Sequence, residues 1–320
     1  MKVTSRNPYT LEKGKIAILL ATYNGEKYLP ELLQSVADQS YREFCCYIHD
    51  DGSNDGTIKI IKKFCKRYPK LFVLVKGEAT GGAKANFIYL LRNIEAEYYM
   101  FCDQDDVWLS DKINHTYALM KKQNKDVPTV VYSDLQIVDS NLNLLDSSYY
   151  HYTGKDPLKN SLIELLKCNV TVGCTMMINR ILREKALQIS DIDNIFMHDW
   201  WISLIASATG KLVYLNQQTI LYRQHGDNSV GAVKKKTTIE KILQYSNYRI
   251  MVEKKNQYVH RPIKFCRELE NVIDGSCEYK DFIEKYALLD NCSKTERIKF
   301  YKDWSLYNES SNIIWQMIWI

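Results

Sequence analysis

The sequence lacks several features that would assign the protein to a common functional class. No run approaches the roughly 18 apolar residues needed to span a bilayer, and residues 1–15 are polar, so we expect neither a membrane span nor a secretory signal. The nine cysteines include no CxxC pair, which argues against structural zinc and favours a reducing cytosol. Neither a GxxxxGKS/T loop nor a GxGxxG loop after the first predicted strand occurs, so we expect no phosphate cradle of glycine backbone.

The charge balance argues against a further class. A formal net charge of +5 over 320 residues is mild, and it is not the basic stripe of a nucleic-acid-binding protein, so we expect no nucleic-acid partner. With 46% hydrophobic and 25% charged residues, the composition is that of a globular protein. The length fits one catalytic α/β domain with an appendage.

Two acidic loops stand out, and each follows an apolar run. Phe44 to Ile48 leads into His49–Thr57 (HDDGSNDGT), and a later run ends in Phe101–Trp108 (FCDQDDVW). Carboxylates this close repel one another unless a cation or a proton compensates them, and hard oxygen ligands select Mg²⁺ or Mn²⁺. The alternative for the second loop is a solvated turn that caps the next helix through Ser110.

Strand-like and helix-like segments alternate in the first part of the chain. The predicted strands are Ile16–Leu20, Phe44–Ile48, Leu71–Val75, Tyr98–Phe101 and Thr129–Tyr132, and the predicted helices are Tyr28–Val36, Thr57–Tyr68, Lys84–Ile94 and Ser110–Gln123. This alternation predicts an α/β fold with a mainly parallel central sheet. Ligands of such sheets bind beyond the carboxyl ends of the strands. We therefore expect the loop after the first strand, Ala21–Gly25, to meet the two acidic loops at one site.

The regular alternation is expected to end near Ser133. Residues 139–157 are polar and turn-rich, which predicts a surface loop near the site. The segments predicted beyond it are helices at Leu158–Leu166, Arg180–Ile189 and Trp200–Ala208, an apolar stretch at Val170–Ile178, and strands at Lys211–Leu215 and Thr219–Tyr222. We place a domain boundary near Val233, with residues 234–320 as a helical C-terminal extension.

The loop motifs resemble those of the inverting family 2 glycosyltransferases of the GT-A fold. They are ATYNG at 21–25, DDGSNDGT at 50–57, DQDDVW at 103–108, HDWW at 198–201 and YRQHG at 222–226. The similarity runs from about Lys15 to about Gly231, and it is greatest to bacterial rhamnosyltransferase-like members that build surface polysaccharide. It implies a GT-A domain over residues 1–233, with a nucleotide-sugar half at about 15–135 and an acceptor half at about 136–233.

The resemblance also implies the chemistry. A metal-dependent inverting enzyme of this kind moves a sugar, here most simply rhamnose, from a nucleoside-diphosphate sugar such as dTDP-rhamnose or a UDP-sugar. The acceptor would be a saccharide or a lipid-linked saccharide, and the enzyme would work in the cytoplasm. Two alternatives remain open at this point: a non-catalytic sugar-nucleotide binding or scaffold protein, and a nucleotidyltransferase, although the latter usually has a glycine-rich basic loop after the first strand.

The resemblance assigns the donor side to the three loops. The residues expected to bind the nucleotide are Ala21, Thr22, Tyr23, Asn24, Asp51, Lys84 and Asp103. Asp51 would accept a hydrogen bond from the base N3–H, while Asp105, Asp103 and His225 would hold Mn²⁺ or Mg²⁺. Asp50 and Asp55 are expected to form turns instead. For Lys84 a solvated helix-start lysine is the alternative.

On the acceptor side, Asp199 matches the catalytic base of the family. An inverting transfer needs one base to take the proton of the attacking hydroxyl, and the start of a helix would keep Asp199 ionised; its alternative is a helix N-cap. The other residues assigned to donor or acceptor binding are Asn86, Gly173, Cys174, His198, Trp200 and Arg223. Arg223 would bind phosphate, with a surface ion pair as its alternative, and a core tryptophan is the alternative for Trp201.

The end of the sequence suggests a partner. Lys234–Lys236 and further cationic residues precede the apolar stretch Ile313–Ile320, a composition that suits a membrane interface holding lipid-linked acceptors. Docking on the protein core or on a second subunit is the alternative. Peripheral contact with the inner face of the cell membrane is therefore one interpretation, and the oligomeric state is not predicted.

Overall fold

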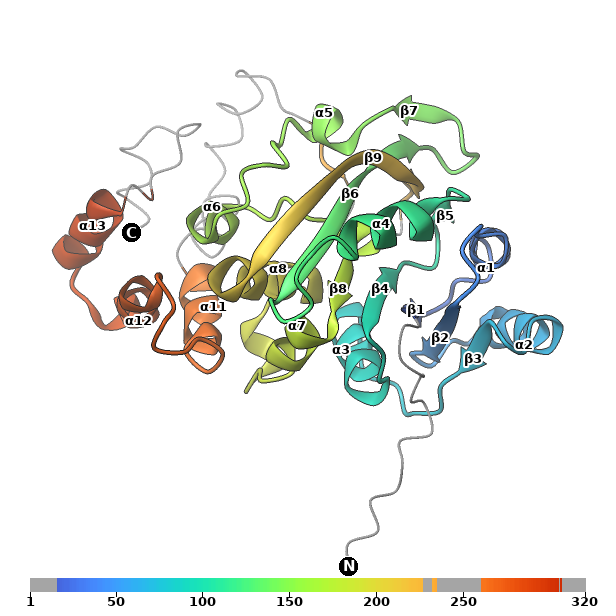
Figure 1. Ribbon diagram of the computed structural model, residues 1–320, viewed down its shortest axis with the longest axis horizontal. Helices are drawn as coiled ribbons and strands as arrows, with labels where there is room; N and C mark the ends of the chain where they lie inside the picture. Colours follow the sequence, from blue (N-terminus) through green and yellow to red (C-terminus); the bar gives the residue numbers. More distant parts are fainter. Residues whose placement is uncertain (1–15, 227–231, 235–259, 305, 307–320) are drawn as a thin grey trace, which may run out of the picture.

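The first part of the chain alternates strands and helices, as predicted. The computed structural model describes residues 16–226, 232–234, 260–304 and 306 (Figure 1). Its first strands are β1 (Ile16–Thr22), β2 (Phe44–Asp50), β3 (Phe72–Leu74) and β4 (Tyr98–Cys102), and the helices between and after them are α1 (Leu29–Ala37), α2 (Thr57–Arg67), α3 (Ala83–Asn93) and α4 (Lys112–Met120). Strands β1 to β4 are mutually parallel, so the ends of β1, β2 and β4 lie at the same edge of the sheet.

The sheet continues with strands that the sequence placed differently. Its order is β3-β2-β1-β4-β8-β6-β9-β5, and β7 pairs with β6. The remaining strands are β5 (Val107–Trp108), β6 (Thr129–Val138), β7 (Leu144–Asp146), β8 (Met177–Asn179) and β9 (Lys211–Arg223). Strand β8 is inserted antiparallel between β4 and β6, whereas β6 and β9 are parallel to each other. The sheet is thus mixed beyond β4, with a parallel half that carries the predicted loops.

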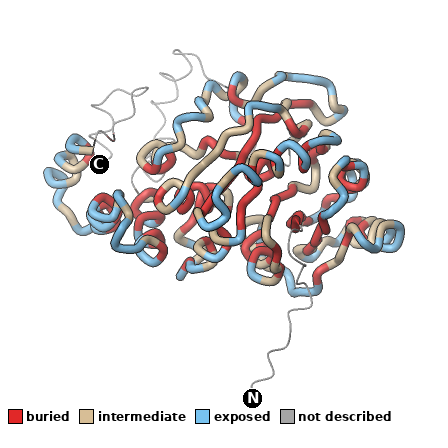
Figure 2. Tube along the Cα trace, viewed as in Figure 1, coloured by how far each residue is buried: buried red, intermediate tan, exposed pale blue. Residues whose placement is uncertain are grey.

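Alternate residues of β1 contribute to two hydrophobic cores, one on each face of the sheet. Ile16, Ile18 and Leu20 pack with α1, α2 and α4, while Ala17 and Leu19 pack with α3, α8 and their neighbours. All five are fully buried, and the buried colour in Figure 2 follows the strands at the centre of the molecule. A strand buried on both faces reads as a continuous apolar run, as IAILL does.

Several predicted boundaries shift in the second part of the chain. Strand β6 does not end near Ser133 but runs on to Val138, and the two predicted strands around residue 216 form the single strand β9, which changes register with β6. Residues 139–157 are not all loop, because they contain β7 and the short helix α5 (Tyr149–Thr153). The predicted helices shorten to α6 (Leu162–Lys167) and α7 (Arg180–Ala186), whereas α8 (His198–Thr209) is longer than predicted. The stretch Val170–Ile178 contains the 3-10 helix η1 (Gly173–Thr175) before β8.

Helical segments follow residue 260 and pack on the rest of the protein. They are α11 (Arg261–Leu269), α12 (Lys280–Ala287), the 3-10 turn η4 (Leu289–Asn291) and α13 (Lys294–Asp303). Ile263, Phe265 and Leu269 of α11 belong to the same hydrophobic core as Trp200 of α8, and α11 lies beside α8 in Figure 1. Helix α11 of the C-terminal extension is therefore continuous with the core under α8.

Two sequence predictions concern residues outside the described ranges. One is the predicted membrane-facing tail at residues 313–320. The other is the part of the predicted helical extension that lies at residues 235–259. Among the residues that the structure does describe, no helix has the length and apolarity needed to cross a membrane.

Candidate active site

A cavity of about 1040 Å³ opens at the sheet edge where β1, β2 and β4 end. It is lined by parts of all three predicted loops and by residues of η1, α8 and α11: Ala21, Thr22, Tyr23, Asp51, Gly81, Gly82, Asn86, Asp103, Gln104, Asp105, Tyr149, Lys155, Asn169, Gly173, Phe196, His198, Asp199, Trp200, Tyr222 and Arg261, among others. Four carboxylates therefore face one space. The predicted convergence of the loops is observed, although the sequence did not indicate that α11 contributes.

The first loop is tied to the loop after β4 by Gln104. The Tyr23 amide donates to Gln104 Oε1, and Gln104 Nε2 donates back to the Tyr23 carbonyl, both at 2.9 Å. Tyr23 is 56% exposed, so its ring is available to a ligand. Asn24 does not line the cavity: its amide donates to Ser53 and its Oδ1 accepts from the Asn54 amide.

The carboxylate of Asp51 holds the loop before α3. Its oxygens accept hydrogen bonds from the Thr80 amide and hydroxyl, from the Gly81 amide at 3.2 Å and from the Gly82 amide at 2.6 Å. Burial raises the pKa of Asp51, but the hydrogen bonds from Thr80, Gly82 and Gly81 outweigh it and leave the pKa below its ordinary value. Gly81 and Gly82 both have positive φ, at 87° and 140°, which side-chain-bearing residues rarely adopt.

Asp50 and Asp55 form turns, as predicted. Asp50 accepts from the Gly52 and Ser53 amides, and Asp55 accepts from the Thr57 amide and hydroxyl. These bonds shape the second loop and leave Asp51 as the acidic residue of that loop that faces the cavity.

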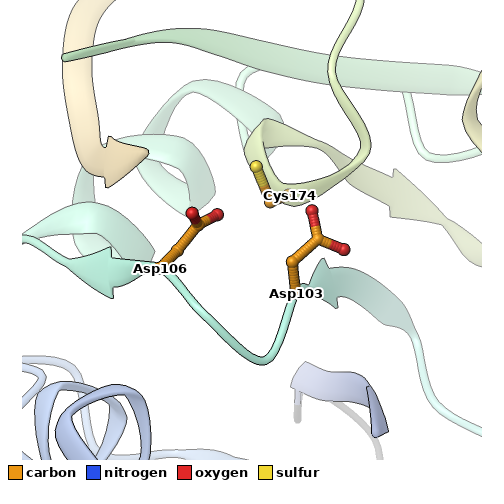
Figure 3. Close-up of side chains that lie close together, drawn as sticks. All are labelled: Asp103, Asp106 and Cys174. Carbon is orange, nitrogen blue, oxygen red and sulfur yellow. The ribbon is translucent and has the colours of Figure 1, made fainter. Parts of the chain in front are cut away.

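The loop after β4 gathers buried acidic groups. Asp103, Asp106 and Cys174 each offer a ligand atom, and these atoms lie within 4.8 Å of one another (Figure 3). Burial, then the charges of Asp105 and Asp199, raise the pKa of Asp103 to about 7. One oxygen of Asp106 accepts from the Arg223 amide at 3.1 Å, and the other is buried with no hydrogen-bond partner in the described part of the chain.

Asp105 points into the cavity and is paired with His225. His225 Nε2 lies 2.9 Å from Asp105 Oδ2, and the imidazole packs against Tyr28 with 4.9 Å between ring centroids. Of the three predicted metal ligands, Asp103 and Asp105 line the cavity and His225 touches Asp105. Cys174 does not line the cavity, and burial raises the pKa of its thiol well above the ordinary value. A protonated thiol is a poor ligand for Mg²⁺ or Mn²⁺.

Asp199 occupies the first turn of α8 but does not cap it. The N-cap residue is Met197, which makes no side-chain cap. Asp199 Oδ1 accepts from the Trp200 amide at 2.7 Å, and Oδ2 accepts from Asn169 Nδ2 at 3.2 Å. Burial raises the pKa of Asp199 to about 6, and backbone hydrogen bonds from Trp200 and Gly173 limit the rise. The group is thus a stronger base than an exposed aspartate and still ionised at neutral pH.

The residues around Asp199 are packed tightly. His198 lies between Phe87 and Phe101, with ring centroids 4.1 and 4.9 Å away, and burial lowers its pKa to about 3, so it is neutral. A Cβ on Gly173 would come within 3.1 Å of His198 Nε2 and 3.4 Å of the Asp199 Cβ. Gly173 therefore allows η1 to approach the start of α8.

The two adjacent tryptophans differ in role. Trp201 is fully buried and donates its indole N–H to the Ala186 carbonyl at 3.0 Å, so it is a core residue. Trp200 lines the cavity and donates its indole N–H to the Leu165 carbonyl at 2.7 Å, which fixes the ring.

Two predicted phosphate-binding cations point elsewhere. Lys84 Nζ donates to the carbonyls of Ile192 and Ile195, at 2.8 and 3.0 Å, and is not part of the cavity lining. Arg223 is 2% exposed, and its guanidinium donates to backbone carbonyls, including that of Asp105 at 2.8 Å, and to the Glu31 carboxylate at 2.6 Å. The contacts of Lys84 are not those of a solvated lysine. The ion pair considered for Arg223 is present, with Glu31, but the guanidinium is buried and not on the surface. Arg223 instead holds the acidic loop in place through its hydrogen bond to the Asp105 carbonyl.

The sequence did not indicate several cavity residues. Gln104 lies within the DQDDVW motif but was given no role there, and Tyr149, Lys155, Phe196 and Arg261, which also line the cavity, lie outside the motifs. For Tyr149 and Lys155 a weak signal existed, because the surface loop of residues 139–157 was expected near the site. Phe196 and Arg261 carried no such signal.

Comparisons with known proteins show the family of the chain. A family model described as "Glycosyl transferase family 2" matches residues 17–187, just over half of the chain. The chain is 29% identical over 228 residues to the dTDP-rhamnosyl transferase RfbG of Shigella flexneri, an alignment that covers 67% of this chain and 74% of that protein. It is 27% identical to the uncharacterized glycosyltransferase RT0329 of Rickettsia typhi, covering 64% and 62% of the two chains.

Solved structures with the same fold include two glycosyltransferase-like neighbours. S. aureus TarS in complex with UDP-GlcNAc superposes with a TM-score of 0.50 and 17% identity, covering 90% of this chain and 79% of that one. The mannosyltransferase PcManGT of Pyrobaculum calidifontis, in complex with GDP-Man and Mn²⁺, gives a TM-score of 0.51 and 16% identity, covering 87% and 70%. At these identities the likeness concerns the fold, which is GT-A.

Proposed function

This chain belongs to glycosyl transferase family 2 and is a glycosyltransferase, and from that premise we propose that it is a metal-dependent inverting enzyme. The donor is a nucleoside-diphosphate sugar, with dTDP-rhamnose as the first candidate and a UDP-sugar as the second. The acceptor is a saccharide or lipid-linked saccharide of a surface polysaccharide. The observation that carries the proposal is the single cavity onto which Asp51, Asp103, Asp105 and Asp199 all open.

At the donor end, Asp51 is the group that reads the base. The hydrogen bonds that it accepts from the loop of residues 80–82 lower its pKa, and an ionised carboxylate accepts a base N3–H more strongly than a neutral acid does. Tyr23, which is largely exposed and held by Gln104, offers a ring on which the base stacks. A base without an N3–H donor would not make this hydrogen bond and would therefore bind less tightly, although the Asp51 carboxylate would keep its hydrogen bonds from residues 80–82.

The acidic end of the cavity suits a hard divalent cation. Asp103 and Asp105 would hold Mn²⁺ or Mg²⁺, with His225 beside Asp105. Asp103 and Asp105 face the cavity from one loop, and the charge of Asp105 adds to burial in raising the pKa of Asp103, so a bound cation would relieve their repulsion. When bound, the ion neutralises the charge that develops on the diphosphate as the sugar leaves.

Asp199 is the base that takes the proton of the acceptor hydroxyl. Asn169 and the Trp200 amide hold one carboxylate oxygen each, so the group has a fixed orientation. Its raised pKa of about 6 makes proton transfer from a hydroxyl less unfavourable while the carboxylate remains ionised at pH 7. For a carboxylate with only a structural role, the same pKa would be a disadvantage, because burial raises the pKa by destabilising the ionised form.

The donor sugar and the cellular setting are further parts of the proposal. The rhamnose assignment is supported by the Shigella flexneri relative, a dTDP-rhamnosyl transferase that is 29% identical to this chain. We further propose that the enzyme acts in the cytoplasm or on the inner face of the cell membrane, where nucleotide sugars and lipid-linked acceptors meet. We also propose a boundary near Val233, followed by a C-terminal extension whose helix α11 packs in the same hydrophobic core as α8.

A ligand panel tests the function. Thermal shift is measured with dTDP-rhamnose, UDP-glucose, UDP-GlcNAc and GDP-mannose, each with and without Mn²⁺, and donor hydrolysis is then followed by release of the nucleoside diphosphate. We expect a Mn²⁺-dependent shift and slow hydrolysis with dTDP-rhamnose. Equal shifts with and without Mn²⁺ would contradict the metal assignment, and a response to another donor alone would replace rhamnose.

A further inference from the structure

The cavity wall beyond Asp199 carries a cation that no carboxylate of the described residues neutralises. Arg261 is the first residue of α11, and its guanidinium carbon lies 3.7 Å from the ring centroid of Phe196 and 5.4 Å from that of Trp200. All three residues line the cavity. Burial lowers the pKa of Arg261 with no opposing contribution from an acidic group, and the described part of the chain gives its guanidinium neither an ion pair nor a hydrogen bond.

Other arginines of the protein are used differently. Arg183 donates to three backbone carbonyls, Arg223 is anchored to the acidic loop, and Arg267 is paired with Asp290. Arg261 instead stacks on an aromatic ring, an arrangement that fixes the guanidinium plane and leaves its N–H donors free. A planar fork of free donors fits a carboxylate or a phosphate, which it can bind through two parallel hydrogen bonds.

The surroundings of Arg261 suit a saccharide. Phe196 is 44% exposed, so part of its ring is open to the apolar face of a sugar. Trp200 stands at 83° to it with 6.0 Å between ring centroids, and Trp200 is held from behind by Phe265 of α11 at 5.3 Å. Phe196 and Trp200 together form an aromatic corner, which these contacts make rigid.

The position of the corner assigns it to the acceptor. Trp200 directly follows Asp199 in α8, so the corner adjoins the proposed base, whereas the diphosphate is expected at Asp103 and Asp105. Lys155 adds a second positive charge on this side of the cavity, although its ammonium already donates to the Tyr149 hydroxyl and the Asn169 carbonyl. Arg261 also lies outside residues 17–187, which match the family model. It is thus a feature of this chain that the family match does not account for.

We propose that Arg261, stacked on Phe196, forms an acceptor subsite that binds an anionic group on the acceptor saccharide, either a phosphate ester or a carboxylate. This inference rests on the proposed function, since it takes the Asp199 side of the cavity as the acceptor side. The C-terminal extension then contributes directly to acceptor choice.

Binding of matched sugars to the full chain tests the subsite. The protein is first saturated with Mn²⁺ and the nucleoside diphosphate selected by the donor panel, so that the diphosphate site is filled. Methyl α-D-glucoside, D-glucose 6-phosphate and D-glucuronate are then titrated by calorimetry into the wild type, Arg261→Gln and Lys264→Gln. Lys264 is an exposed residue of the same helix, so its variant makes the same change in net charge away from the cavity.

We expect the wild type and Lys264→Gln to bind at least one anionic sugar at least tenfold more tightly than the neutral glucoside. Arg261→Gln should reduce that preference to within about twofold. Preference for the phosphate alone or for the carboxylate alone identifies the anion. Equal binding of all three sugars to the wild type, or an anion preference that survives in Arg261→Gln, would overturn the proposal.

Two controls separate other causes. If Arg261→Gln melts at a lower temperature than the wild type, Arg261→Lys is used, which keeps the charge and should keep part of the preference; loss of the neutral and anionic sugars alike would indicate a structural role and overturn the proposal. Donor hydrolysis is measured in parallel. Hydrolysis without anion preference refutes the subsite alone, whereas absence of nucleotide-sugar binding and hydrolysis refutes the proposed function, and the subsite with it.

Discussion

Arg223 Nε donates a hydrogen bond of 2.8 Å to the backbone carbonyl of Asp105, so a buried cation holds the main chain of the residue proposed to bind metal. The same side chain donates to the Ser140 carbonyl and the Glu31 carboxylate, and its own amide donates to Asp106. The acidic loop is thereby joined to α1 and to the end of β6. Its shape depends on a residue that does not face the cavity.

Replacement of Arg223 by Lys should weaken Mn²⁺ binding about tenfold. An ammonium cannot reproduce the fork of donors, and each buried carbonyl left unpaired costs about 1–3 kcal/mol. Mn²⁺ affinity is measured by calorimetry, with thermal unfolding as a check on the fold. Arg180→Lys is the control, since Arg180 is an exposed member of an i,i+4 pair with Glu184. Wild-type Mn²⁺ affinity in Arg223→Lys would show that the loop keeps its shape without the guanidinium.

Asp105→Asn should abolish sugar transfer while the protein still folds. The amide keeps the size of the side chain but removes the charge needed to hold a divalent cation, so we expect a loss of about 100-fold or more in turnover. Product formation is measured over a range of Mn²⁺ concentrations. The exposed Asp126→Asn makes the same chemical change far from the motifs and should be active. Metal-dependent turnover in Asp105→Asn would exclude Asp105 as a ligand.

Asp51→Ala should weaken binding of every donor that carries the same base, by a similar factor for each sugar. The change removes the acceptor for the base and releases the loop of residues 80–82. Thr80→Val separates the two effects, because it removes only the hydroxyl that donates to Asp51 and keeps the carboxylate. Dissociation constants of several sugars on one nucleotide provide the measurement. If the affinity for a single sugar changed and the others did not, Asp51 would belong to the sugar pocket.

Asp199→Asn should retain donor and metal binding and lose transfer by roughly 100-fold or more, the scale of general base catalysis. The amide can still accept from the Trp200 amide, so the start of α8 should remain intact. Transfer rate and donor affinity are measured on the same preparation. A variant with a near-normal transfer rate would place the base elsewhere.

The pH dependence of transfer should follow Asp199. Its raised pKa of about 6 means that the carboxylate becomes protonated as the pH falls through 6, whereas an ordinary aspartate would stay ionised to about pH 4. The base is needed in its ionised form, so activity is present above pH 6 and lost below it. A profile of kcat/KM against pH at saturating Mn²⁺ gives the midpoint. A midpoint near 4 would contradict the buried environment of Asp199.

The sequence predicted the parts of the site that follow from strand order. ATYNG, DDGSNDGT and DQDDVW each follow a strand, and parallel strands bring such ends together, so the gathering of Asp51, Asp103 and Asp105 could be anticipated. The turn roles of Asp50 and Asp55 were likewise local and correct.

Contacts between distant segments could not be predicted in the same way. Lys84 and Arg223 were expected at phosphate, but packing against the carbonyls of residues 192 and 195 and of Asp105 decides their direction. Strand β8 pairs between β4 and β6, but it has only three residues, which is too few for the sequence to predict that pairing. Arg261 reaches the cavity through the packing of α11 on Trp200, which no local pattern encodes.

The pair of hydrogen bonds between Gln104 and Tyr23 links two loops that are proposed to bind different ligands. The loop proposed to stack on the base and the loop proposed to bind the metal must adopt their bound positions together, because the Gln104 amide bridges them. If the metal binds more tightly when the two loops are in that arrangement, the nucleotide also binds more tightly in it. Thermodynamic reciprocity then requires that metal strengthen nucleotide binding by the same factor by which nucleotide strengthens metal binding. Gln104 is thus placed to determine how strongly metal binding and donor binding favour each other, although its side chain carries no charge.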